Sequence, residues 1–319
     1  MRSVGSTLYY LRTRAWIWSF IATAAVWIAT ILFTGGHGGG QMLTAALSFA
    51  TFTIIVGTGQ MFVITTGPGN VDLSIPATMA LAGAVTTKIM DTQDGMILTG
   101  LAVALGIGLL VGLFNYGLIR LLRIPPIIAT LSASFLVQST AIAYGRGLRI
   151  KPPPALAEFT TAEVGGVPIL AIGGMVFTAV MGVVLARSFY GRSVLAVGQN
   201  MRAAWLAGIP VERTRLITYC LSAMLAGLSG LLLSGFSGGS SLNMGEEYLL
   251  ASIAVVVIGG TSVAGGRANV PGIWGAALFL YLLVTMLNTF GASAGLRLIM
   301  TGLIIIGVIT LAGSGEQKR

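Results

Sequence analysis

The sequence predicts an all-α protein, a polytopic membrane helical bundle of about ten transmembrane helices in which some elements are short or re-entrant. Composition is the main reason. Hydrophobic residues make up 55% of the 319 residues and charged residues only 8%, whereas soluble domains carry about 25% charged residues. The 45 glycines fit close packing of membrane helices, where small residues let backbones approach. Most of such a surface must face lipid, so we expect one transmembrane domain over residues 1–319.

Ten apolar segments are long enough, or nearly so, to be membrane spans, which need about 20 mostly apolar residues. We expect them at residues 15–34, 42–65, 73–88, 96–119, 125–145, 167–186, 214–235, 247–264, 270–290 and 295–313. The third and the eighth are short, which is typical of broken or re-entrant helices. Such backbone is tolerated in a membrane where protein or a water-filled cavity surrounds it.

The distribution of Lys and Arg predicts the orientation, because cytoplasmic loops carry an excess of these residues. With the N-terminus inside, thirteen of the eighteen basic residues fall on the cytoplasmic side and five on the other side. Both termini are then cytoplasmic. The most basic loop lies between the sixth and seventh spans.

Several functional classes find no support in the sequence. There is no basic run, so nucleic acid is not an expected partner. The only histidine, His37, lies in GGHGGG without partners, so no metal site is expected. None of the lysines follows a glycine as in the phosphate-binding GxxxxGK[ST] loop. The chain therefore does not hydrolyse ATP by such a loop, and its energy must come from another polypeptide or from an ion gradient.

Ion-coupled carriers usually keep ionisable groups at membrane depth. The nine acidic residues here all fall at span ends or in loops. This position disfavours a proton-coupled carrier, although coupling through backbone carbonyls stays open as an alternative.

The basic loop contains the stretch NMRAAWLAGIPVERTR, residues 200–215. We expect a short helix from Met201 to Ile209, with Asn200 as its N-cap and Gly208 and Pro210 at its end. Two interpretations are open. Its apolar stripe could lie on lipid headgroups, or the helix could dock on a soluble partner.

Four ordered motifs resemble the permease subunits of ribose-type ABC importers. AVGQNMRAAWLAGI (196–209) is similar to AVGxNxxAAxxAGI, and GNVDLSIPATMALAG (69–83) is similar to GGIDLSVGxxMALAG. GLFNYGLIRLLRIPPIIATLSA (112–133) and SIAVVVIGGTSVAGGRANVPG (252–272) resemble two further family motifs. The resemblance covers roughly residues 50 to 312. Pro76 departs from the family glycine, and Arg202 from a commonly acidic position.

The resemblance implies that residues 191–213 form a cytoplasmic coupling loop that inserts into a separate ATP-binding subunit. The residues carried over to this role are Arg202, Ala203, Ala204, Leu206, Ala207, Gly208 and Ile209. ATP and Mg would be bound by that partner, and this chain would bind no cofactor. The resemblance also implies a periplasmic substrate-binding protein, a second permease copy or paralogue, and a place in the bacterial cytoplasmic (inner) membrane.

Uncharged polar groups suit a pathway for a monosaccharide or related polar solute, because hydroxyls need donors and acceptors rather than charge. The candidates are Gln60, Asn70, Asp72, Ser74, Phe114, Asn115 and Gln138. Each could instead make a structural contact between helices. Asp72 and Ser74 could also cap the third span.

The solute itself stays open. An ion-coupled secondary carrier is the alternative mechanism. Branched-chain amino acids, nucleosides and autoinducer-2-like signals are alternative solutes of an ABC permease.

Overall fold

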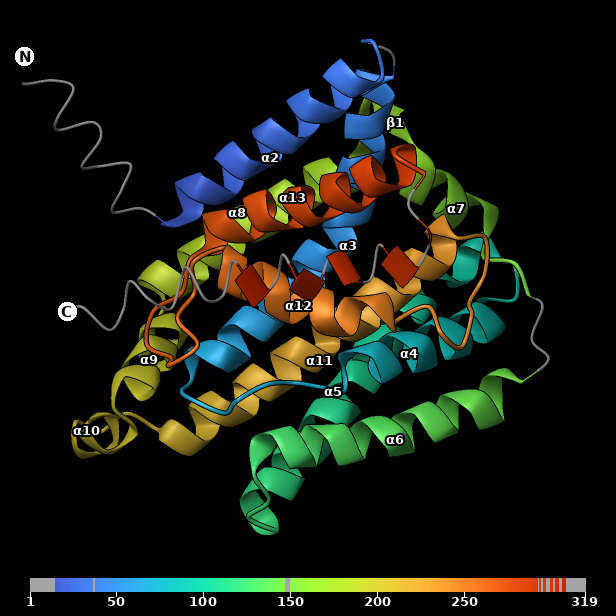
Figure 1. Cartoon of the computed structure of the whole chain (residues 1–319). Helices are drawn as coiled ribbons and strands as arrows, with labels where there is room; N and C mark the ends of the chain where they lie inside the picture. The colour runs from blue at the N-terminus through green and yellow to red at the C-terminus, as the bar shows by residue number, and fades with distance from the viewer. Residues whose placement is uncertain are drawn as a thin grey trace, which may run out of the picture.

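The structure is a computed structural model that describes residues 15–36, 38–146 and 150–291 and scattered positions from 293 to 307. Most of the described chain is helical (Figure 1). The helices are α2 (Ala15–Phe33), α3 (Gly39–Thr65), α4 (Ile75–Met90), α5 (Ile97–Leu121), α6 (Pro126–Gly145), α7 (Pro154–Thr161), α8 (Ile169–Arg187), α9 (Phe189–Gln199), α10 (Met201–Leu206), α11 (Val211–Phe236), α12 (Glu247–Ile258) and α13 (Val270–Thr289). A 3-10 turn, η1 (Asp94–Met96), precedes α5, and β1 (Glu163–Val164) pairs with β2 (Val167–Pro168) in a hairpin.

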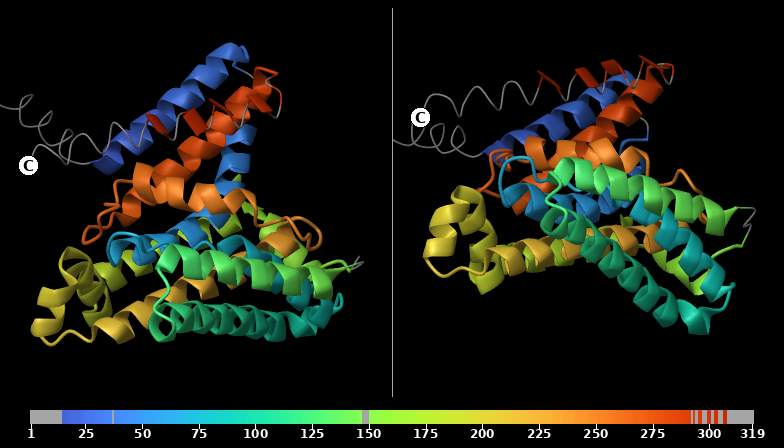
Figure 2. Two further views of the ribbon diagram at one scale, coloured as in Figure 1. Left: turned by 60° about the horizontal axis from the view of Figure 1, so that its bottom comes forward. Right: turned by 90° about the horizontal axis from the view of Figure 1, so that it is seen from below.

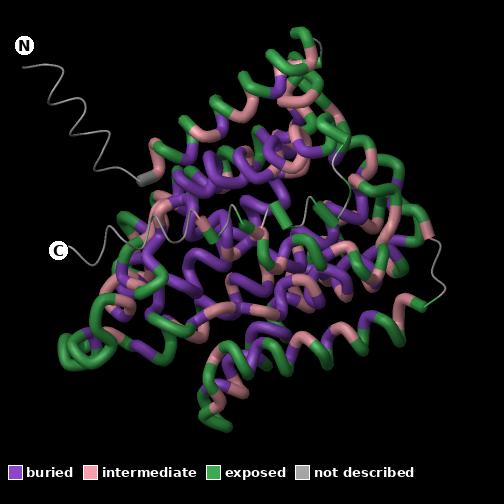
Figure 3. The backbone as a smooth tube through the Cα atoms, viewed as in Figure 1, coloured by how far each residue is buried: buried purple, intermediate pink, exposed green. Residues whose placement is uncertain are grey.

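Seven helices of the described chain are long and apolar enough to cross a membrane: α2, α3, α5 with η1, α6, α8, α11 and α13. The centre of the bundle is formed by α3, α11 and α13, while α2, α5, α6 and α8 lie around them with fewer buried residues (Figure 3). The outer faces carry large exposed apolar side chains, such as Leu110, Phe135 and Val176. Apolar residues on the outside as well as the inside are what a lipid environment requires.

Glycines allow a close contact between α5 and α11. A β-carbon at Gly108 or Gly112 would overlap the backbone of α11, and one at Gly227 would overlap that of α5. These small residues let the two helices approach backbone to backbone, as is typical of membrane helix pairs.

Two helices, α4 and α12, are too short to cross a membrane alone. Helix α4 begins after residues 66–74, which leave the end of α3 and turn back into the bundle. Helix α12 ends at Ile258 because Gly259 packs directly on the backbone of Gly272, and Gly260 then adopts a left-handed φ of 89°. Both short helices were expected from the sequence. The eighth span was predicted to end at residue 264, which is wrong, because α12 ends at Ile258.

The helices of the described chain match nine of the ten predicted spans within a few residues at most ends. Helix α11 begins at Val211, three residues before the predicted position, directly after Pro210. The tenth span, 295–313, lies mostly outside the described residues, as does His37. The total of ten therefore stays a prediction.

The two ends of the bundle differ. Helices α9 and α10 protrude at one end in both views of Figure 2, and α7 with the β-hairpin lies at the other (Figure 1). Contacts agree with this arrangement: Gly198 of α9 meets Thr65 at the end of α3, whereas Gly235 near the end of α11 meets Leu156 of α7. Because α11 starts beside α10, it runs from the first end to the second.

Candidate functional site

A carboxylate, Asp72, is held inside the bundle by hydrogen bonds from three segments. Its Oδ1 accepts from the backbone N–H and the hydroxyl of Ser74, at 3.0 and 2.6 Å. Its Oδ2 accepts from the hydroxyl of Ser222 on α11 at 2.8 Å. The Asn115 amide of α5 donates to Asp72 Oδ1 at 3.4 Å and to Ser74 Oγ at 2.8 Å. All four side chains are fully buried, so they tie the start of α4 to α5 and α11.

The same turn is fixed to two more helices. Gln60 of α3 accepts from the backbone N–H of Asp72 at 3.1 Å. The Thr130 hydroxyl of α6 accepts from the N–H of Leu73 at 3.1 Å and bonds the carbonyl of Val71 at 3.0 Å. The irregular backbone of residues 70–74 thus finds its partners in side chains of α3 and α6, as buried peptide groups must.

Asn70 links this turn to the first half of α11. Its Oδ1 accepts from Arg215 Nη2 at 3.1 Å and from the Tyr219 hydroxyl at 3.0 Å, and its Nδ2 donates to the carbonyl of Gly67 at 3.1 Å. Residues 215, 219 and 222 are spaced i, i+4 and i+7, so they lie on one face of α11. We call the following set the Asp72 network: Gln60, Asn70, Asp72, Ser74, Asn115, Arg215, Tyr219 and Ser222.

The network has unused hydrogen-bonding capacity. Four buried side-chain atoms of the described residues have no hydrogen-bond partner, and three of them belong to this network: Gln60 Nε2, Asn115 Oδ1 and Arg215 Nε. Buried polar atoms without partners are rare and costly in folded proteins. Two donors and one acceptor of the network are therefore not used by any described protein group.

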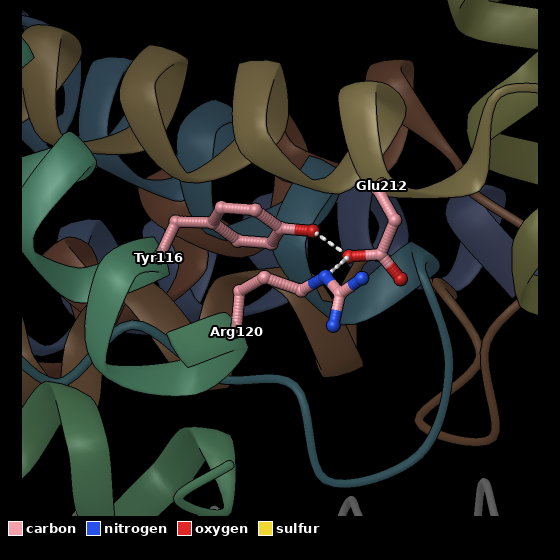
Figure 4. Close-up of polar contacts among 3 residues, drawn as sticks. All are labelled: Tyr116, Arg120 and Glu212. Atoms are coloured by element: carbon pink, nitrogen blue, oxygen red, sulfur yellow. Dashed lines mark hydrogen bonds and ion pairs between the residues drawn. The ribbon is translucent and has the colours of Figure 1, made fainter. Parts of the chain in front are cut away.

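A second polar contact joins α5 to the first turn of α11, next to the basic end. Arg120 Nε lies 2.8 Å from Glu212 Oε2, and the Tyr116 hydroxyl donates to the same oxygen (Figure 4). The Arg215 guanidinium lies 6.0 Å from the centre of the Tyr116 ring. Polar contacts therefore continue from Glu212 through Tyr116 and Arg215 to the Asp72 network.

The exposed segment before α11 folds as a capped turn of helix. Asn200 Oδ1 accepts from the N–H of Ala203 at 2.9 Å, which confirms the predicted N-cap. Helix α10 ends at Leu206 rather than at the predicted Ile209, because Gly208 adopts a left-handed φ of 81°. The N–H of Gly208 bonds Trp205 O and that of Ile209 bonds Ala204 O, the two bonds of a Schellman motif.

This segment presents a mixed surface. Trp205 and Leu206 are 66% and 71% exposed, whereas Ala204 is buried with Val197 and Val211. A groove of about 790 Å³ lies between α10 and the start of α11 and is lined by Trp205, Ile209, Arg120, Arg202 and Arg213, among others. The groove thus combines apolar side chains with an excess of positive charge.

Glycine contacts connect α9 directly to the bundle. A β-carbon at Gly198 would overlap the carbonyl oxygen of Thr65 and the backbone of Gly266. The N–H of Gly266 also donates to Thr65 O at 2.9 Å. With no side chain between them, α9, the end of α3 and the 259–269 loop pack backbone against backbone.

A family model described as "Branched-chain amino acid transport system / permease component" matches residues 41–309. The chain belongs to this permease family. No solved structure matches it.

Curated relatives of this permease cover most of its length. It is 32% identical over 266 residues to the ribose import permease RbsC of Bacillus subtilis (strain 168), covering 81% of this chain and 80% of the relative. It is 28% identical over 300 residues to the autoinducer 2 import system permease LsrC of Enterobacter sp. (strain 638), covering 94% and 87%. A probable ABC transporter permease, y4mJ of Sinorhizobium fredii, is 29% identical over 291 residues, covering 88% and 86%. The predicted resemblance to ABC import permeases is confirmed.

The permease brings five of the seven predicted pathway residues together: Gln60, Asn70, Asp72, Ser74 and Asn115. Asp72 and Ser74 were both expected as possible caps of the third span. Ser74 is the N-cap residue of α4, but its side chain makes no cap hydrogen bond. The hydroxyl instead donates to Asp72, whose own carboxylate satisfies the N–H of Ser74.

The other two predicted residues lie elsewhere in the permease. Phe114 is 41% exposed, so it does not join its buried neighbour Asn115. Gln138 of α6 donates to the carbonyl of Leu242 at 3.0 Å, beyond the end of α11 that faces α7. Helical geometry separates Phe114 from Asn115 by about 100° around the axis, so adjacent residues of one helix face different surroundings.

The position of Asp72 corrects another expectation. In the sequence Asp72 falls at the edge of a span, yet its carboxylate bonds Ser222 near the middle of the 26-residue α11. An acidic residue therefore does lie at the depth of the membrane-crossing helices, because residues 66–74 turn back into the bundle.

Sequence reasoning missed the residues of α11 that complete this site: Arg215, Tyr219 and Ser222. Their i, i+4, i+7 spacing was a signal, because it places three polar side chains in one stripe along the helix. Glu212 was missed for a different reason, since its partners Tyr116 and Arg120 lie almost a hundred positions away.

Proposed function

We propose that this chain is the permease subunit of a bacterial ABC importer in the cytoplasmic (inner) membrane. It moves a monosaccharide or a related small polar solute, driven by ATP hydrolysis on a separate cytoplasmic subunit. The chain itself is a transport subunit and not an enzyme. ATP and Mg are bound by the partner. A periplasmic substrate-binding protein delivers the solute, and a second permease copy or paralogue completes the pore.

The observation that carries the proposal is the α10 segment, residues 200–209. It protrudes from one end of the bundle, is capped at both ends, and exposes Trp205 and Leu206. An exposed apolar surface with a polar rim is typical of a site that binds another protein. Residues 191–213 then act as the coupling loop, and both termini are cytoplasmic.

The adjacent groove favours a partner with acidic residues. Arg202 and Arg213 line it without an ion pair among the described residues, whereas Arg120 is paired with Glu212. Complementary charges across an interface speed association and fix its orientation. We expect the ATP-binding subunit to place a carboxylate against Arg202.

A solute with hydroxyl groups fits the other features. The interior polar side chains are mainly amides and hydroxyls, which recognise neutral polar groups. Two relatives are, by their names, permeases for ribose and for autoinducer 2. The exposed apolar faces of α5, α6 and α8 leave area for both lipid and a second permease copy.

The test is ATP-driven uptake by the full complex in liposomes. Gly208→Glu adds a charged side chain to the α10 segment, and Gly208 is not part of the Asp72 network. We expect ATP hydrolysis to continue while uptake falls at least about tenfold, which corresponds to about 1.4 kcal/mol of lost coupling. Glu163→Gln, in the hairpin at the opposite end, is the control and should leave uptake unchanged. Uptake by the permease alone, without any ATP-binding subunit, would overturn the proposal in favour of a secondary carrier.

A further inference from the structure

A second cavity lies at the end of the bundle opposite α10. It has a volume of about 470 Å³ and is formed where α3, the end of α11, the 237–246 loop, the start of α12 and α13 meet. Its lining includes Phe49, Tyr248, Tyr281, Asn243 and Glu247. Pathway candidates taken from the sequence include none of these residues.

The polar groups of this cavity have no partners of their own. Within the described chain, no hydrogen bond or ion pair involves the side chains of Asn243, Glu247, Ser240 or Ser241, or the hydroxyls of Tyr248 and Tyr281. The contrast with the Asp72 network is clear, because nearly every side chain there already bonds another. The cavity therefore offers an amide, a carboxylate and several hydroxyls that are free to bond a solute.

Aromatic rings form an apolar wall beside these groups. Phe49 stacks on Tyr281 with ring centres 4.9 Å apart and an interplanar angle of 11°, and Phe236 meets Phe49 edge-on at 5.0 Å. Tyr248 is almost completely buried beneath the cavity. A rigid aromatic wall next to unpaired polar groups suits a ligand that has both C–H faces and hydroxyl groups.

The charges of the cavity disfavour solutes that carry a carboxylate. Its lining holds no Lys, Arg or His, so the carboxylate of an amino acid or a sugar acid would find no cation. The N-terminus of α12, where the helix dipole is positive, already carries Glu246 and Glu247. A second negative charge here is repelled, whereas hydroxyl groups can donate to the Glu247 carboxylate.

We infer that this cavity is a binding site for a neutral polyhydroxylated solute at the end of the permease where the solute enters. The inference rests on the proposed function for the direction of transport, and it goes further by assigning the chemistry to specific residues. Glu247 and Asn243 bond the hydroxyls, and the Phe49–Tyr281 pair contacts the apolar face of the ring.

The test uses cysteine protection in the full-length permease in lipid nanodiscs. The only native cysteine, Cys220, is buried in α11, so Ser240→Cys introduces one accessible thiol in the cavity. Ser237→Cys, at an exposed lining residue that is given no role in binding, is a second reporter in case the first fails to fold. Thr161→Cys on α7, at the same end but outside the cavity, controls for effects of the solute on the reagent. The rate of labelling by a membrane-impermeant maleimide is measured with ribose, fructose, ribonate and leucine.

A neutral sugar at ten times its dissociation constant should slow labelling in the cavity about tenfold and leave Thr161→Cys unchanged. Ribonate, which adds a carboxylate, and leucine should not protect. Equal protection by ribonate or leucine would overturn the assigned chemistry. If the complete complex imports a neutral sugar that never protects either reporter, the cavity inference is wrong while the proposed function stands. If the complex imports no neutral sugar, the proposed function itself fails.

Discussion

The Asp72 carboxylate accepts a hydrogen bond of 2.8 Å from the Ser222 hydroxyl, across 150 positions of the sequence. The bond joins the turn before the short helix α4 to the middle of α11, the helix that begins at the α10 segment. In the proposed complex one end of α11 lies next to the segment that binds the ATP-binding subunit, and its centre holds the start of α4. Four predictions test this connection and the helix contacts around it.

The first prediction concerns two serines on the same helix. Ser222→Ala removes a donor to a buried carboxylate and should lower the free energy of unfolding by about 1.5–3 kcal/mol, because bonds to charged groups are stronger than neutral ones. Ser229 is also fully buried, but its hydroxyl has no partner in the described chain. Ser229→Ala should therefore leave stability unchanged or raise it. Thermal unfolding of the purified variants in detergent measures both. Equal destabilisation by the two changes would show that the Asp72 bond is not important.

The second prediction concerns Glu212. Its carboxylate and the Arg120 side chain are 52% and 57% exposed, so their ion pair is worth no more than about 1 kcal/mol. Glu212→Ala should change thermal stability little. It frees the start of α11 from Tyr116 and Arg120, however, so the amount of solute imported per ATP hydrolysed should fall. Both quantities are measured in the reconstituted complex.

Glu158→Ala on α7 removes an acidic residue at the opposite end and is the control for Glu212→Ala. If Glu212→Ala keeps the wild-type ratio of import to hydrolysis, the contact in Figure 4 has no role in coupling.

The third prediction compares two glycines in helices. Gly198→Ala would force a β-carbon into the backbone of Thr65 and Gly266, and overpacking of this kind costs about 1–3 kcal/mol. At Gly106 of α5 a β-carbon meets no atom within 4 Å. Gly106→Ala should therefore stabilise the permease by about 0.5–1 kcal/mol, because alanine favours helix. The unfolding temperature should fall for Gly198→Ala and rise for Gly106→Ala, relative to the wild type. A shift in the same direction for both variants would contradict the close contact at Gly198.

The fourth prediction separates conformation from crowding at Gly208. This residue has a left-handed φ of 81°, yet a β-carbon there would meet nothing within 4 Å. Gly208→Asn should keep most ATP-driven uptake, since asparagine tolerates this conformation. Gly208→Val should lose it, because β-branched residues rarely adopt positive φ. Uptake in liposomes with the ATP-binding subunit is the measurement. Equal activity of the two variants would mean that the Schellman turn is not needed.

The local parts of this structure followed from the sequence. Runs of apolar residues predicted nine of the described helices, because a lipid environment permits few alternatives to helix. The cap at Asn200 and the turn at Gly208 were also predictable, since both depend on bonds between residues at most five positions apart. The end of α12 was not, because it depends on the backbone of Gly272, which belongs to the next helix.

The sequence alone thus determined that this chain is a membrane bundle with a capped, basic segment at one end, and its motifs pointed to the permease family. Only the tertiary structure decided which polar residues meet. Asp72 lies beside Ser222 and Asn115 because residues 66–74 turn back into the bundle and α5 and α11 pack glycine to backbone. Phe114 and Gln138 lie away from these residues, which also only the tertiary structure decided. The physical reason is that helix formation is satisfied within one segment, whereas the depth and direction of a buried side chain depend on the helices packed around it.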